Sequence, residues 1–131
     1  MSEVTPNMIL VVDDEADILR LVEALLQQLG YKTVTAKGAD AALKTFQSMA
    51  KSPELVLTDV VMPGMSGPML ADRLLQLDPG VKVLFMSGYD DRHVVQKYVV
   101  EQGFALIPKP FTLQRLGAFV ADVLEGRQPS V

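Results

Sequence analysis

The sequence contains no cysteine and only one histidine, His93. Without cysteine the chain can form neither a disulfide framework nor a thiolate metal site, which fits the reducing conditions of a cytosol. A single histidine without partner ligands is weak evidence for a metal site or a phosphohistidine, so we expect His93 to be an ordinary surface residue. Any metal site must therefore depend on oxygen ligands.

Long runs of one kind of residue are also missing. No apolar stretch approaches the roughly 20 residues that a membrane helix needs, and residues 1–7 lack the basic and apolar regions of a signal peptide. The formal net charge of −4 argues against nucleic acid or an anionic membrane as a direct partner. We expect a cytoplasmic protein that binds neither nucleic acid directly nor a membrane.

The composition and length indicate one globular domain. Hydrophobic residues make up 49% of the 131 residues and charged residues 21%, which is typical of a folded chain. We expect a domain over 8–125, between a flexible segment at 1–7 and a tail or linker stub at 126–131. The apolar patterns predict strands at 8–12, 32–36, 55–58, 81–86 and 104–107, and helices at 15–29, 39–50, 68–77, 90–102 and 112–124. This alternation predicts an α/β fold with a parallel sheet covered on both faces.

Two of the apolar runs end abruptly in acidic residues. The first strand runs into Asp13 and Asp14, and the third runs into Asp59. The carboxyl ends of strands in an open α/β sheet line the crevice where ligands bind. Three carboxylates gathered there repel one another unless a hard cation or a proton relieves them. The sequence therefore predicts a divalent metal beside a reactive aspartate.

The other strand ends complete a set of groups suited to phosphoryl transfer. The fourth strand ends at Ser87 and the fifth leads into Lys109. Asp59 is the predicted acceptor, because a carboxylate can form an acyl phosphate and its loop leaves it accessible. We expect the metal to be bound directly by Asp14, with help from Asp13 through water and from the main-chain carbonyl of Val61. A hydroxyl and an ammonium would then contact the remaining phosphoryl oxygens.

These residues resemble the receiver domains of two-component response regulators. The resemblance covers residues 8–125 and depends on four motifs in order: Ile-Leu-Val-Val-Asp-Asp-Glu at 9–15, Leu-Thr-Asp-Val-Val-Met-Pro-Gly-Met-Ser-Gly at 57–67, Met-Ser-Gly at 86–88 and Pro-Lys-Pro-Phe at 108–111. It implies a flavodoxin-like fold with five parallel strands in the order 2-1-3-4-5. It also implies Mg²⁺, for which Mn²⁺ can substitute, at Asp14, Asp59 and the Val61 carbonyl.

The resemblance further implies a phosphoacceptor switch, with no enzymatic chemistry beyond its own phosphorylation and dephosphorylation. Asp59 would take a phosphoryl group from a phosphohistidine of a histidine kinase or a histidine phosphotransfer domain, and Ser87 and Lys109 would respond to it. The Lys109–Pro110 peptide bond would be cis. A homodimer is also compatible with the family, and exposed residues near Ile18 and Leu19 would add a docking surface for a kinase's helical bundle.

The sequence departs from the family's pattern at three positions. Leu106 stands three residues before Lys109, where the family usually has a Tyr or Phe that swings inward on activation. Val61 has no group to orient a hydrolytic water, and Tyr89 is bulky enough to screen the phosphoryl group. We therefore expect an altered output mechanism and slow self-dephosphorylation.

Other functions fit the residues less well. A phosphatase of the haloacid dehalogenase type would place Asp-x-Asp after the first strand, whereas Asp13 and Asp14 are adjacent. A flavin or nucleotide binder would need a Gly-rich or hydroxyl-rich phosphate cradle at this point. The alternative that stays open is a degenerate receiver that acts as a protein-binding module without phosphorylation. The stretches 84–91 and 106–111 look most like C-terminal receivers of hybrid sensor histidine kinases, so the chain is either such a detached domain or a free-standing regulator.

Overall fold

The computed structural model describes residues 7–88 and 101–127. Five parallel strands form one sheet in the order β2-β1-β3-β4-β5, as the resemblance predicts. The strands are β1 (Met8–Asp13), β2 (Lys32–Lys37), β3 (Leu55–Asp59), β4 (Lys82–Ser87) and β5 (Ala105–Pro108), and the helices are α1 (Ala16–Gln28), α2 (Ala39–Ser48), α3 (Gly67–Leu77) and α5 (Leu113–Leu124). The predicted ends of these elements are correct to within two residues. Most of the helix predicted at 90–102 lies outside the described residues. Its last two residues, 101 and 102, are described and are helical.

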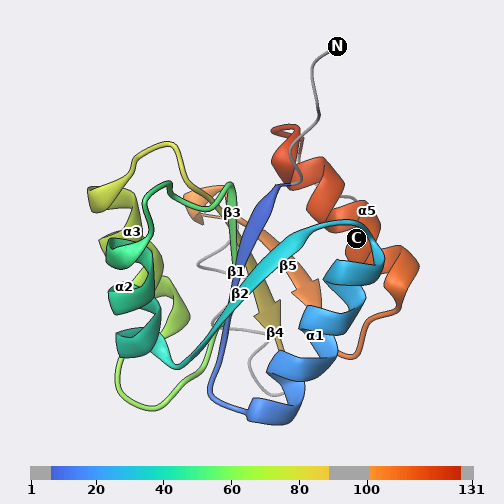
Figure 1. The fold of residues 1–131 in the computed structure, drawn as a ribbon, viewed down its shortest axis with the longest axis horizontal. Coiled ribbons are helices and arrows are strands. Elements are labelled where there is room, and N and C mark those ends of the chain that lie inside the picture. The colour runs from blue at the N-terminus through green and yellow to red at the C-terminus, as the bar shows by residue number, and fades with distance from the viewer. Residues whose placement is uncertain (1–6, 89–100, 128–131) are drawn as a thin grey trace.

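The sheet lies between two layers of helices, with α1 and α5 on one face and α2 and α3 on the other (Figure 1). The two buried faces of β1 explain why residues 8–12 are all apolar. Ile9 and Val11 pack in the cluster with α1 and α5, whereas Leu10 and Val12 pack in the cluster with α2 and α3. Successive side chains point to opposite faces of a strand, and here both faces are buried. A continuous apolar run is the result.

Local signals in the sequence fix three of the helix ends. The Ser66 side chain accepts a hydrogen bond from the Met69 N–H at the start of α3, and the Thr112 side chain accepts one from the Arg115 N–H at the start of α5. Gly30, at a φ of 97°, follows the end of α1 in the left-handed conformation that favours glycine. In residues 7–88 and 101–127, no helix is long and apolar enough to cross a membrane.

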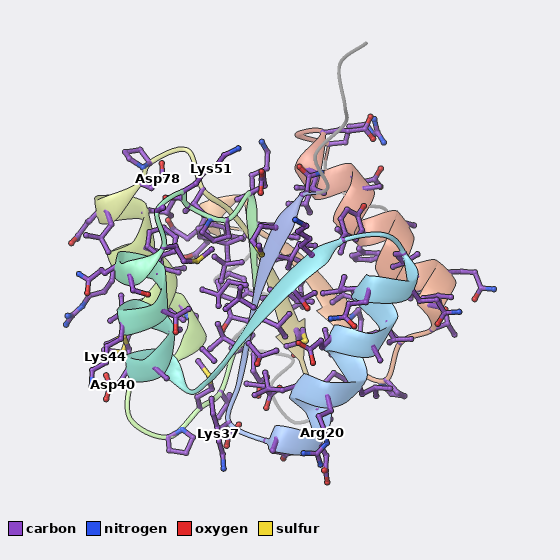
Figure 2. All side chains as sticks on the ribbon, in the orientation of Figure 1. Arg20, Lys37, Asp40, Lys44, Lys51 and Asp78 are labelled. Carbon is purple, nitrogen blue, oxygen red and sulfur yellow. The ribbon has the colours of Figure 1, made fainter. Side chains whose placement is uncertain are left out.

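The strand register brings the chemically distinctive residues to one edge of the sheet. Val12 pairs with Thr58, so Asp13 and Asp59 follow at neighbouring strand ends. Ser87, the last residue of β4, pairs with Pro108 of β5. Figure 2 shows Lys37, the last residue of β2, at this carboxyl edge. The sheet thereby creates the crevice that the site occupies.

The apolar side chains of α1 do not all face the core, because Leu21 is 55% exposed. Leu19, near which we expected exposed docking residues, is only 7% exposed and packs against the sheet, and Ile18 is partly buried. The buried face of α1 is therefore rotated toward Leu19, and Leu21 is the apolar side chain that this helix presents to solvent.

The buried face of α3 gives a test of the packing. Leu74→Ala should lower the free energy of unfolding by about 2–5 kcal/mol, because it opens a cavity at a side chain with no exposed surface. Leu77→Ala, on the same helix but at a side chain that is 49% exposed, should change it by less than about 0.5 kcal/mol. Urea denaturation of both variants measures the difference, and equal losses would contradict the assigned faces of α3.

Candidate functional site

Three carboxylates meet at the carboxyl edge of the sheet. Asp13 ends β1, Asp14 follows it, and Asp59 ends β3. One oxygen from each lies within 4.8 Å of the others. Asp13 has no exposed surface and Asp59 is 7% exposed, whereas Asp14 is half-buried. The structure thus brings together the three acidic residues that the sequence predicts.

Lys109 is the cation that faces these carboxylates. Its Nζ lies 3.2 Å from Asp13 Oδ2 and 3.4 Å from Asp59 Oδ1. Its backbone N–H donates a 2.8 Å hydrogen bond to the Ser87 carbonyl, which fixes the loop after β5 against the end of β4. The Lys109–Pro110 peptide bond is cis, as predicted.

Burial and charge together set the protonation of the site. Burial raises the pKa of Asp59 to about 6, with a further rise from Asp13, while Lys109 and the Val60 N–H oppose the rise. Burial lowers the pKa of Lys109, but the attraction of Asp59 and Asp13 outweighs it, so that this pKa lies above its usual value. At neutral pH the Lys109 ammonium therefore faces a mostly ionised Asp59.

The donor set fits a divalent cation. Three carboxylates and one ammonium leave negative charge in a largely buried place, and hard cations such as Mg²⁺ prefer oxygen ligands. Both oxygens of Asp13 already accept hydrogen bonds, Oδ1 from the Glu15 N–H at 2.9 Å and Oδ2 from Lys109. Asp14 and Asp59 are therefore the better candidates for direct ligands, with Asp13 acting through water.

Ser87 ends β4 and Val61 lies in the loop after β3, and the Ser87 hydroxyl does not point its hydrogen bond at the carboxylates. Ser87 is 3% exposed, and its hydroxyl donates a 3.1 Å hydrogen bond to the Gly88 carbonyl. Val61 follows Asp59 by two residues, and its side chain is 57% exposed. Leu106 is partly buried and packs with Phe85 and neighbouring apolar residues. Tyr89 and His93 lie outside the described residues.

Sequence reasoning did not find two groups of residues around the site. Thr58 and Gly67 contact the main chain of Asp59, but a threonine inside an apolar strand and a glycine at a helix start are too common to attract notice. A cavity of about 380 Å³ also opens beside Asp14, lined in part by Lys37, Asp40 and Met65. Its walls come from three separate segments of the chain, so only the fold brings them together.

Comparison with known proteins identifies the family. The model of the response regulator receiver domain matches residues 9–121. The chain belongs to the response regulator receiver domain family. This receiver is 34% identical over 119 residues to the sensor kinase CckA of Brucella abortus and to the nitrogen assimilation regulatory protein NtrX of Azorhizobium caulinodans. The matches cover 91% and 89% of this chain, but only 12% and 26% of those proteins.

Solved structures agree with this assignment. A receiver domain protein from Clostridium thermocellum superposes with a TM-score of 0.81 at 27% identity, covering 92% of this chain and 95% of that one. NtrX from Brucella abortus superposes with a TM-score of 0.83 at 33% identity, and the match covers 93% of this chain and 27% of that one. The flavodoxin-like fold of the receiver is thereby established.

The pKa of Asp59 leads to a prediction for stability. A buried carboxyl whose pKa lies above its ordinary value of 3.8 costs stability once it ionises, so the cost is absent below about pH 4 and complete above about pH 6. Asp59→Asn should therefore stabilise the metal-free receiver by about 1–3 kcal/mol at pH 7.5. Urea denaturation in EDTA measures this gain.

The same measurement at lower pH is the internal control. The gain from Asp59→Asn should shrink as the pH falls through about 6 and disappear near pH 4. A gain that is constant over this range would mean that the substitution acts through packing and not through the charge of Asp59.

Proposed function

We propose that this receiver accepts a phosphoryl group from a phosphohistidine onto Asp59 in a Mg²⁺-dependent reaction and then switches conformation. The observation that supports this most is the placement of Asp59, which is largely buried beside two other carboxylates, with Lys109 Nζ 3.4 Å from its Oδ1. The partner is a histidine kinase or a histidine phosphotransfer domain. The domain spans residues 8–125, and its place of action is the cytoplasm.

The transfer requires an ionised acceptor. With a pKa of about 6, Asp59 is mostly ionised at neutral pH. The phosphorus–nitrogen bond of the donor breaks as a bond forms between phosphorus and an Asp59 carboxylate oxygen, and the donor imidazole keeps the electron pair and takes up a proton. Asp14, Asp59 and the Val61 carbonyl would hold Mg²⁺, which would supply the positive charge that an anionic donor needs to approach an acidic site.

Two side chains would detect the new phosphoryl group. Lys109 can exchange its contact with Asp59 for one with a phosphoryl oxygen, because its Nζ already lies at that carboxylate. Ser87 donates its hydroxyl to the Gly88 carbonyl and can redirect it toward the phosphoryl group. Since the Lys109 N–H binds the Ser87 carbonyl, a shift of one loop is carried to the other. Output through Leu106, without an aromatic swing, depends on repacking with Phe85.

The similarity to the sensor kinase CckA supports an origin in a hybrid kinase, of which this receiver would be one part. Its own chemistry would then be limited to phosphorylation and dephosphorylation of Asp59, while the parent chain would contain the kinase. The alternative, a binding module that is never phosphorylated, is less well supported because Asp13, Asp14, Asp59 and Lys109 are all present and assembled.

Phosphorylation can be tested without the kinase. Incubation with Mg²⁺ and acetyl phosphate or phosphoramidate should add the mass of one phosphoryl group to the intact protein, because either donor can transfer directly to an ionised carboxylate. Asp59→Asn and wild type in EDTA are the controls and should show no gain. If folded wild type gains no mass with Mg²⁺, the binding module becomes the better interpretation.

The lifetime of the phosphoryl group tests the role of Val61. This exposed apolar side chain cannot hold a hydrolytic water, so the wild-type signal should decay slowly. Val61→Asn supplies an amide that can orient water and should shorten the lifetime, as followed by intact mass over time. Met69→Asn, at an equally exposed position on α3, should have no effect. A wild-type lifetime of seconds that Val61→Asn does not change would contradict this role.

A further inference from the structure

The main-chain carbonyl of Asp59 is held from two sides. The Thr58 hydroxyl, which has no exposed surface, donates a 3.0 Å hydrogen bond to this oxygen. On the other side, Gly67 comes so close that a Cβ added to it would lie 2.2 Å from the same oxygen and 3.0 Å from Val60 Cα. Real Cβ atoms do not approach backbone so closely, so only glycine fits at this position.

Gly67 is also joined to the acceptor segment by a hydrogen bond. Its N–H donates to the Val60 carbonyl at 2.8 Å and closes the loop between β3 and α3. Ser66 caps α3 at the same point. The start of the helix is therefore fixed directly against the peptide group that follows Asp59, and the loop that contains Val61 is bounded by this contact.

The held peptide group in turn contacts the acceptor carboxylate. The Val60 N–H donates to Asp59 Oδ1 at 2.9 Å and to the Met86 carbonyl at 3.1 Å. A rotation of the peptide between Asp59 and Val60 would move this N–H, and the carboxylate with it. The Asp59 carbonyl and the Val60 N–H belong to the same peptide group. Contacts that hold the Asp59 carbonyl therefore also set the orientation of the Asp59 carboxylate toward Lys109.

We infer that Thr58 and Gly67 are positioning residues that clamp the Asp59–Val60 peptide and so aim the acceptor carboxylate. The inference rests on the proposed function of Asp59. Catalytic groups must be held within fractions of an ångström of their productive positions, and main-chain contacts from rigid elements provide such support. The clamp explains a polar side chain near the end of a buried strand and a glycine at the first residue of a helix.

A pair of substitutions at Thr58 tests the clamp with little change in volume. Thr58→Val removes the hydroxyl, whereas Thr58→Ser keeps it. Thr58→Val should weaken Mg²⁺ binding and slow phosphorylation by acetyl phosphate by about threefold to tenfold, and Thr58→Ser should resemble wild type. In metal-free protein, the NMR resonance of the Val60 amide should move in Thr58→Val and not in Thr58→Ser, because this amide binds Asp59 Oδ1.

Gly67→Ala tests the second side of the clamp. Its methyl group must displace the Asp59 carbonyl, so we expect a loss of about a hundredfold in the phosphorylation rate. Gly117→Ala is the matched control, because it adds the same methyl group to α5 against the flexible side chain of Leu29. This control should keep wild-type Mg²⁺ affinity and phosphorylation rate.

The outcomes separate the clamp from the proposed function. If wild type itself neither binds Mg²⁺ nor gains a phosphoryl group, the proposed function fails. If wild type does both, and Thr58→Val matches Thr58→Ser in Mg²⁺ affinity, phosphorylation rate and Val60 resonance, the clamp is refuted even when Gly67→Ala does not fold. A folded Gly67→Ala that reacts at the wild-type rate would refute it as well.

Discussion

Repulsion among three carboxylates at one edge of a parallel sheet is the constraint on which the rest of this receiver depends. The register of β1 and β3 forces Asp13 and Asp59 to adjacent strand ends, where burial makes each negative charge costly. Lys109 offsets part of that cost through contacts of 3.2 and 3.4 Å. The remaining negative charge makes the site suitable for a divalent cation, and with it for an anionic phosphodonor.

The same constraint connects chemistry to signalling. Because Lys109 stabilises the carboxylates before any reaction, a phosphoryl group on Asp59 would compete for a cation that is already in place. The backbone bond from Lys109 to Ser87 links the two loops that must respond. In the proposed function, communication beyond them would pass through the apolar cluster in which Leu106 packs against Phe85, at a position where the family's pattern leads us to expect an aromatic side chain. On the proposed function, the receiver would thus combine an assembled acceptor site with an altered route for output.

Much of the fold and of the site could be predicted because both depend on local patterns. A buried parallel strand is apolar on both faces, so the transition from Val12 to Asp13 marked a strand end, and strand ends of this kind converge. What could not be predicted depends on tertiary contacts. The helical period alone does not say that Leu19 is buried and Leu21 exposed. The close approach of Gly67 to the Asp59 carbonyl exists only when α3 packs against the end of β3. The bond from Thr58 to the same carbonyl is local, but a threonine in a strand is too common to indicate it.

Titration of the free energy of unfolding with Mg²⁺ at pH 7.5 and constant ionic strength tests the central claim most directly. If the carboxylates form a site for a divalent cation in the folded state, stability should rise with Mg²⁺ concentration and reach a slope of about 1.4 kcal/mol per tenfold increase above the dissociation constant. A free energy of unfolding that does not depend on Mg²⁺ would contradict the claim that these three carboxylates are assembled to bind a metal.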